Sequence, residues 1–335
     1  YLFFFKVVLF FKKNFCKKKE CRFKVLSVGN LSVGGTGKSV FVQFLEKKLS
    51  DFSGAIILRG YKSEAEKSGK SFLVSDGKNI LLDQEFSGDE AFMLANNVNS
   101  PVVIGSDRAL SYSVLEDRFK NLDYVLLDDA YQNFKLKKDF EILLLDAKSP
   151  LENGHCLPAG KLREKDYSRA DVIILTNASG VSSFHLKKEM EKLAKKFDKE
   201  KIFAGEHAFS GIYKKDSNLV EINSIKEKKI LAFAGIGSFI NFEKSLKNLG
   251  FNKILLKEYP DHYKYTKTDL FEILNYLKFN LVDILLTTQK DWVKIAPFLS
   301  EKEKNNFYVL RVEFNFLEEK FEKDFFNLLT KKIIM

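Results

Sequence analysis

The sequence predicts an α/β protein with a mostly parallel sheet flanked by helices, a second, smaller α/β domain and an apolar N-terminal helix. Three observations support this prediction. Short apolar runs recur along the chain, helix-like segments separate many of them, and the series restarts after a polar stretch around residues 213–229. Near-continuous apolar runs are typical of parallel strands buried on both faces. Such a sheet binds its ligands at the carboxyl ends of the strands.

The N-terminal segment 1–15 is apolar except for a few lysines, and residues 12–24 then carry seven basic side chains against one acid, Glu20. A membrane-spanning helix needs roughly 20 apolar residues, and the segment is shorter. An apolar helix followed by a basic cluster favours a helix in the interface of an anionic membrane. Two alternatives stay open: a helix docked on the protein, and a spanning helix lengthened by residues before Tyr1.

The first series of elements follows directly from residue 24. The apolar runs predict strands, and the polar–apolar periodicity between many of them predicts helices. The predicted strands are 25–28, 55–58, 101–104, 124–127, 141–145 and 172–175, followed by strands around 201–209. The predicted helices are 38–49, 89–98, 108–119 and 183–196.

A second series starts at residue 229 and has the same character. It begins at residue 229 with the run ILAFAGIG, its further predicted strands are 253–256, 283–287 and about 307–312, and its predicted helices are 239–249 and 266–277. We therefore expect three parts: a membrane-associating segment 1–23, a first domain 24–212 and a C-terminal domain 213–335 that contributes to the active-site cleft.

Composition excludes several classes of protein. With 335 residues, 45% hydrophobic, 5 Pro and 18 Gly, the chain is long enough for two domains and unlike a disordered or fibrous protein. Its three cysteines have no regular spacing, which argues against a disulfide framework and favours a reducing compartment. The formal charge of +10 comes mainly from lysine. It is weak support for nucleic-acid binding without a recognisable module.

A glycine-rich loop follows the first predicted strand and leads straight into a helix. It comprises Ser32, Val33, Gly34, Gly35, Thr36, Gly37, Lys38 and Ser39. Gly37, Lys38 and Ser39 fit the Walker A pattern of P-loop proteins, whereas Ser32 replaces its first glycine. The backbone N–H groups would surround phosphate oxygens, Lys38 would reach the β- and γ-phosphates, and Ser39 would bind Mg²⁺. A glycine-rich turn without a nucleotide is the alternative.

Acidic residues occur at two further places. Asp128 and Asp129 end an apolar strand, where P-loop folds carry acids that hold Mg²⁺ directly or through water. Asp89 and Glu90 open a predicted helix, where acids are ordinary caps. A phosphotransferase also needs a carboxylate near the γ-phosphate to accept the proton of the attacking hydroxyl. His262, in a second-domain loop, is a candidate for a catalytic group on the substrate side.

Ten short motifs occur in one fixed order between residues 24 and 295. They are VGNLSVGGTGKS, LRGY, SGDEA, PVVIGSDR, LLDDAYQN, LPAGKLRE, SRADVIILTN, FAGIG, YPDHYKYT and TTQKD. Together they closely resemble the tetraacyldisaccharide 4′-kinase family of lipid A biosynthesis. Asn133 departs from that family, which commonly has His after the Gln of this motif. Ala130 and Gln289 depart from its usual Gly and Glu.

The resemblance implies a kinase that uses ATP and Mg²⁺ at the cytoplasmic face of the inner membrane, either peripheral or anchored by its N-terminal helix. We expect a monomer, although the sequence does not define the oligomeric state. The implied acceptor is the 4′-hydroxyl of a tetraacylated glucosamine disaccharide 1-phosphate. By position, Asp89 is similar to the family's proton acceptor and His262 to its helper, while Asp128, Asp129 and Glu90 lie near the metal. The cleft residues are Arg59, Gln132, Arg163 and Glu164.

The scarce arginines add a separate indication. Only seven of the 55 basic residues are arginine, and four of them fall inside the motifs: Arg59, Arg108, Arg163 and Arg169. In a chain where lysine is the default cation, arginine suggests a need for its planar fork, at a phosphate or a carboxylate.

Two other functions remain as alternatives. A membrane-attached GTPase switch is one, because Thr288-Gln289-Lys290-Asp291 weakly resembles the guanine-binding motif of GTPases. No Asp-x-x-Gly follows the loop, which counts against it. A nucleic-acid-binding module is the other, and only the net charge favours it. We expect no nucleic-acid partner.

Overall fold

A computed structural model describes residues 18–33, 36–61, 63–215, 218–237, 239–261 and 263–334. The predicted N-terminal helix, Gly34, Gly35 and His262 lie outside these ranges. Within them, no helix is both long and apolar enough to cross a membrane. The contacts divide the chain into two compact units, one formed by the residues up to His207 and from Phe314 onward, the other by Ala208–Glu313.

The first unit is built on a sheet with the strand order β8-β7-β6-β1-β5-β2-β4-β3. All neighbours are parallel except β3, which is antiparallel to β4. The strands are β1 Lys24–Asn30, β2 Gly54–Leu58, β3 Phe72–Asp76, β4 Pro101–Ile104, β5 Tyr124–Asp128, β6 Phe140–Asp146, β7 Val172–Thr176 and β8 Ile202–Tyr213. Strands β2, β4, β5 and β7 are buried throughout, as the apolar runs predicted.

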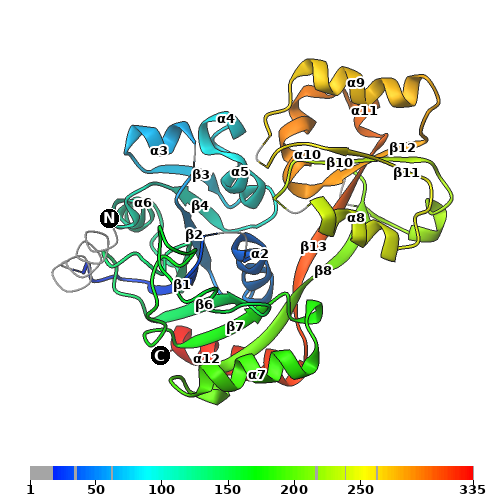
Figure 1. Cartoon of the computed structure of the whole chain (residues 1–335). Helices are drawn as coiled ribbons and strands as arrows, with labels where there is room; N and C mark the ends of the chain where they lie inside the picture. The colour runs from blue at the N-terminus through cyan, green and yellow to red at the C-terminus, as the bar shows by residue number, and fades with distance from the viewer. Residues whose placement is uncertain are drawn as a thin grey trace. The chain divides into compact units, whose positions relative to one another are not determined.

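Helices cover this sheet (Figure 1). They are α2 Lys38–Lys48, α3 Glu64–Ser68, α4 Gln84–Ser87, α5 Asp89–Ala95, α6 Arg108–Arg118, α7 Ser183–Ala194 and α12 Glu319–Ile334. Helix α5 ends three residues before its predicted end at 98. There the side chains of Asn96 and Asn97 donate to the carbonyls of Phe92 and Met93, and side-chain bonds of this kind compete with continued helix.

The second unit has the strand order β11-β10-β12-β13, all parallel, and the short strand β9 pairs with β8. Its strands are β9 Leu219–Val220, β10 Ile230–Ala234, β11 Ile254–Glu258, β12 Ile284–Thr288 and β13 Phe307–Phe316. Its helices are α8 Phe239–Asn248, α9 Lys267–Lys278, α10 Gln289–Ile295 and α11 Glu301–Lys304. Strands β8 and β13 each contribute residues to both units.

Phenylalanine rings form much of the core of the first unit. Phe41 of α2 packs edge-on against Phe314, with ring centroids 4.8 Å apart, and Phe316 lies 5.3 Å from Phe325 of α12. These rings belong to one buried cluster, and α12 lies among the elements of the first unit (Figure 1). The sequence-based division placed 213–335 in a single C-terminal domain. The contact division instead places residues from 314 onward with the first unit, because their apolar side chains complete its core.

Candidate active site

The phosphate-loop region occupies the turn between β1 and α2. Gly37 adopts a left-handed conformation, with φ 74°, and Lys38 is the first residue of α2. A β-carbon on Gly37 would lie 1.9 Å from Nε2 of His207, so both backbone and space require glycine here. Asn30, fully buried at the end of β1, donates to the hydroxyl of Thr36 at 3.1 Å. Strand, loop and helix thus follow in the predicted order.

A second loop is joined to the beginning of the phosphate loop. The N–H of Val33 donates to the Lys161 carbonyl at 2.8 Å, and the N–H of Arg163 donates to the Leu31 carbonyl at 2.6 Å. Ser32 forms an isolated bridge with Leu162. The amide of Val33 is therefore bonded to protein, and the pairing brings the predicted cleft residues Arg163 and Glu164 beside the loop.

Asp128, the last residue of β5, is buried in the site. Its Oδ2 accepts a long hydrogen bond of 3.5 Å from the hydroxyl of Ser39, and its Oδ1 has no hydrogen-bond partner. Burial, reinforced by the negative charge of Glu90, raises the pKa of Asp128 to about 7. Arg108 lies behind it and donates to the Asp128 carbonyl at 2.9 Å and to the Gly105 carbonyl at 2.6 Å. Burial lowers the pKa of Arg108 to about 10.

Asp129 pairs with two cations. Its Oδ1 lies 3.4 Å from Nζ of Lys38, and Nη1 of Arg163 donates to both of its oxygens at 2.9 and 3.1 Å. Burial by itself would raise the pKa of Asp129, but Lys38 and Arg163 outweigh burial and hold that pKa below its ordinary value. The two neighbouring acids therefore differ. Two cations stabilise the carboxylate of Asp129, whereas nearby positive charge does not offset the burial of Asp128.

The donor set around Asp128 fits a magnesium ion. Ser39 and Asp128 supply the hard oxygen atoms that Mg²⁺ prefers, and the unpartnered Oδ1 of Asp128 provides a free acceptor. Throughout the described ranges, no group of three or more His, Cys, Asp or Glu side chains could hold a metal. Mg²⁺ here would thus need nucleotide phosphate and water as its other ligands, as is usual in phosphoryl-transfer sites.

Asp89 begins α5 directly after Gly88, whose φ is 84°. The side chain of Gln84 in α4 donates to its Oδ1 at 2.8 Å. Asp89 is half-buried and occupies the first position of α5, whose N-cap residue is Gly88. The positive φ at Gly88 sets a sharp change of chain direction between α4 and α5.

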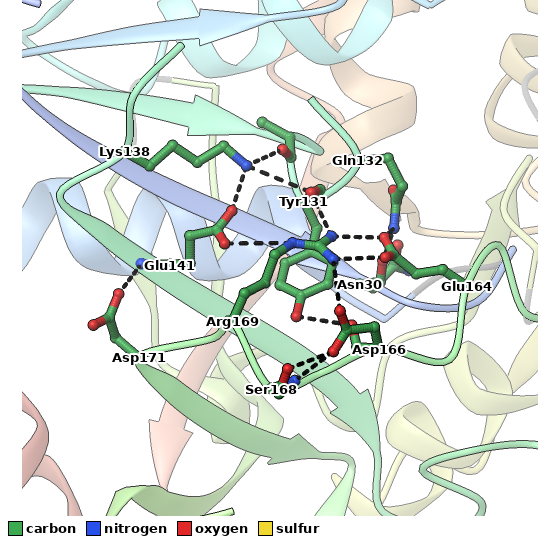
Figure 2. Close-up of polar contacts among 11 residues, drawn as sticks. Asn30, Tyr131, Gln132, Lys138, Glu141, Glu164, Asp166, Ser168, Arg169 and Asp171 are labelled. Carbon is green, nitrogen blue, oxygen red and sulfur yellow. Dashed lines mark hydrogen bonds and ion pairs between the residues drawn. The ribbon is translucent and has the colours of Figure 1, made fainter. Parts of the chain in front are cut away.

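A partly buried polar network extends from the cleft residues to Arg169 (Figure 2). Gln132 donates to the Asn30 carbonyl at 2.9 Å and to Oε1 of Glu164 at 2.8 Å, and its own Oε1 accepts from Arg163 at 3.3 Å. Arg169 binds Glu164 with both ends of its fork, each at 2.7 Å. All four predicted cleft residues can now be placed: three join this network, and Arg59 pairs with Glu66 at 2.7 Å.

The four motif arginines therefore use their forks on protein groups. Arg59, Arg163 and Arg169 bind carboxylates, and Arg108 binds backbone carbonyls. Asn133, which departs from the family pattern, forms hydrogen bonds within the turn that contains it. Its N–H donates to the Ala130 carbonyl at 2.9 Å, and its Oδ1 accepts from the Lys135 N–H at 3.1 Å.

His207 and Asn30 also lie in this region, and the sequence pattern predicts no role for either of them. His207 lies in β8 with Nε2 3.3 Å from the Gly37 carbonyl and Nδ1 3.2 Å from Oδ1 of Asn177. Burial lowers the pKa of His207. The sequence around His207 shows only a polar residue on a strand, and such residues are also common at surface positions.

In the second unit, the proposed guanine motif has a structural use. Asp291 is fully buried and accepts from the hydroxyl of Thr288 at 2.7 Å and the N–H of Gly235 at 3.1 Å. It also pairs with Lys294 at 3.5 Å, and Lys294 donates to the Tyr263 carbonyl at 3.3 Å. The TTQKD motif thus joins the FAGIG and PDHY loops within this unit. Because Asp291 is buried and bonded to these groups, its carboxylate is not available to bind a guanine base.

A lysine-bearing glycine loop at the end of β1, beside an acid pair at the end of the neighbouring strand β5, defines a P-loop nucleotide-binding protein. The family model described as Tetraacyldisaccharide-1-P 4′-kinase (LpxK) matches residues 2–331. The chain belongs to this family, as its motifs indicated.

Curated relatives named tetraacyldisaccharide 4′-kinase agree with this assignment. The protein from Halothermothrix orenii is 31% identical over 324 residues, covering 91% of this chain and 83% of the relative. That from Elusimicrobium minutum is 33% identical, covering 96% and 88%. A crystal structure of the apo form of LpxK from Aquifex aeolicus in complex with ATP matches with a TM-score of 0.75. It is 29% identical and covers 97% of this chain and 96% of that one. The predicted α/β fold is confirmed, and the GTPase alternative is not supported.

Proposed function

We propose that the chain transfers the γ-phosphoryl group of ATP to the 4′-hydroxyl of a tetraacylated glucosamine disaccharide 1-phosphate, a precursor of lipid A. Family membership supports the reaction and the acceptor. The observation that carries the proposal is the pairing of the loop lysine with the acid that follows β5, at 3.4 Å between Lys38 and Asp129. Phosphoryl transfer depends on such a cation next to the metal-binding acids.

The residues have separate roles in this proposal. The acceptor oxygen attacks the γ-phosphorus, the bond from that phosphorus to the ADP oxygen breaks, and the hydroxyl proton passes to the carboxylate of Asp89. Gln84 orients that carboxylate through its 2.8 Å hydrogen bond. Lys38 and Arg163 stabilise the charge that develops on the phosphoryl oxygens. His262 is assigned as the helper of Asp89, on the basis of its PDH motif.

Mg²⁺ would be held by Ser39 and Asp128, and it would supply charge neutralisation between the β- and γ-phosphates. Glu90 contributes negative charge near Asp128 and completes an environment that favours a cation. Burial raises the pKa of Asp128 to about 7, and Asp128 would hold the ion in its carboxylate form.

The acceptor is a membrane lipid, so the enzyme must reach an anionic surface. The basic run between residues 12 and 24 behind an apolar segment supports a location on the cytoplasmic face of the inner membrane. We assign ATP binding to the first unit and the substrate-side loop with His262 to the second unit.

The test uses the purified chain, labelled ATP, Mg²⁺ and the disaccharide 1-phosphate acceptor in detergent micelles. The expected product carries one new phosphate at the 4′ position, and GTP should replace ATP poorly. An acceptor lacking the 4′-hydroxyl is the matched control. Absence of transfer by intact protein, or equal labelling of the control acceptor, contradicts the proposal.

A further inference from the structure

We propose that Arg169 is a positioning residue for phosphoryl transfer, acting through Glu164 and Gln132 on Arg163. This inference rests on the proposed function. Arg169 itself touches neither the phosphate loop nor Asp129 among its described contacts. Its fork binds Glu164, and Glu164 accepts from Gln132 (Figure 2). Gln132 in turn accepts from Arg163, one of the cations of the site.

The first link fixes Glu164. Nη1 and Nη2 of Arg169 bind separate oxygens of this carboxylate, each at 2.7 Å, in the bidentate geometry that specifies orientation as well as distance. The side chains of Arg169 and Glu164 are only 18% and 10% exposed, so neither is free to turn toward bulk water. Oε1 of Glu164 is thereby presented to Gln132.

The second link fixes which way the amide of Gln132 points. Its Nε2 donates to Oε1 of Glu164 at 2.8 Å and to the Asn30 carbonyl at 2.9 Å. Both partners are acceptors, so only the amide nitrogen can face them. The amide oxygen must then face Arg163, whose Nη1 lies 3.3 Å away.

The third link reaches the phosphate loop. The same Nη1 of Arg163 binds Asp129, and Asp129 pairs with Lys38. Arg163 thus has two acceptors that define its place, the carboxylate and the amide oxygen of Gln132. Release of Glu164 would free Gln132 to turn, and the second acceptor of Arg163 would be lost.

A lysine at position 169 could not hold Glu164 in the same orientation. Besides its two bonds to Glu164, Arg169 donates from Nη2 to the Tyr131 carbonyl at 2.8 Å and lies over the Tyr131 ring, with Cζ 3.8 Å from the ring centre. A lysine would keep the charge but could form neither the two parallel bonds nor the stacked contact. The Arg169→Lys variant therefore separates charge from geometry.

The experiment compares kcat, KM and nucleotide affinity for Arg169→Lys in the wild-type and the Gln132→Ala backgrounds. We expect Arg169→Lys to lower kcat by about 10- to 100-fold, with KM for the lipid changed less than about threefold. In the Gln132→Ala background the same change should cost less than about twofold, since the link is already broken. Binding of a fluorescent ATP analogue, followed separately, should weaken less than kcat.

Asp171→Ala is the matched control. Asp171 accepts from the Glu141 N–H at 2.8 Å, in the same network but away from Glu164, so its loss should lower the unfolding temperature and leave kcat within about twofold. Unchanged kcat in Arg169→Lys, or an equal loss in both backgrounds, would overturn the inference. If Arg169→Lys does not fold, Glu164→Gln breaks the same link at constant volume and carries the same expectations. Inactive wild-type protein would instead reject the proposed function.

Discussion

Nζ of Lys38 lies 3.4 Å from Oδ1 of Asp129, so the lysine of the phosphate loop is paired with an acid. A nucleotide must compete with this carboxylate for Lys38. Since Asp129 also holds Arg163, one carboxylate keeps both cations in the site and limits their mutual repulsion.

Asp129→Asn should therefore uncouple nucleotide binding from transfer. Without Mg²⁺, we expect ATP to bind several-fold more tightly, because Lys38 and Arg163 lose their competing anion. With Mg²⁺ and acceptor, kcat should fall by about 100-fold or more, since the cations are no longer placed. Titration calorimetry in a chelating buffer measures the first effect. Weaker binding in that buffer would show that Asp129 does not compete with phosphate.

Asp89→Asn should reduce kcat by about 10²- to 10⁴-fold, the range that a general base contributes, with little change in ATP affinity. Gln84→Ala should give a smaller loss, because it removes only the 2.8 Å hydrogen bond that orients Asp89. Single-turnover transfer with bound ATP separates this effect from binding. An Asp89→Asn enzyme with normal single-turnover rates would exclude Asp89 as the proton acceptor.

Gly37→Ala combines two costs that can be measured separately. The new β-carbon would lie 1.9 Å from Nε2 of His207, and its backbone would stay at φ 74°. Removal of the ring in Gly37→Ala/His207→Ala should relieve the clash and leave the left-handed penalty of about 1–2 kcal/mol. Denaturant unfolding of the four proteins in the cycle gives both terms. Strictly additive effects would mean that the ring yields without cost.

Glu46 provides a pH-dependent stability away from the site. Burial raises the pKa of Glu46, although Ser100 and Tyr124 donate to its oxygens at 2.5 and 2.9 Å. Because the folded pKa is raised, the stabilising contribution is complete below the unfolded value of about 4.3 and declines as pH rises through the folded value. Glu46→Gln should raise the free energy of unfolding at pH 8 and have little effect at pH 4. A gain that is independent of pH would argue that the carboxyl is not the cause.

Asp291→Ala tests the use of the TTQKD motif. The substitution removes a buried carboxylate from its ion pair with Lys294, and breaking such a pair costs about 3–5 kcal/mol. We expect a lower unfolding temperature and an unchanged preference for ATP over GTP. Asp283→Ala is a surface control, since its carboxylate accepts from the exposed N–H of Lys229. A shift toward GTP in Asp291→Ala would revive a base-reading role.

Most strands and helices of the first unit could be predicted from the sequence, because the patterns that indicate them are local. Buried parallel strands leave continuous apolar runs, and the loop around Gly37 follows its strand and precedes its helix without interruption. The paired acids could be placed near that loop because parallel strands such as β1 and β5 end at the same edge. Asp128 and Lys38 were recognisable for this reason.

Contacts between segments that are far apart in the sequence could not be predicted. The sequence near Phe314 and Phe325 does not indicate that these rings pack on Phe41. The apolar pattern of a strand or helix identifies its buried face but not the element against which that face packs. The same holds for Arg169. Its motif indicated a planar cation, whereas the orientation of Gln132 depends on three separate chain segments meeting in space.

The return of residues 314–334 to the first unit has a consequence for synthesis. On the ribosome, the whole second unit, Ala208–Glu313, emerges before Phe314, Phe316 and Phe325. The aromatic cluster around Phe41 therefore stays incomplete while a later part of the chain is already free to fold. Nascent chains stalled before residue 314 should expose this surface to chaperones, and the nucleotide-binding unit becomes the last part of the enzyme to mature.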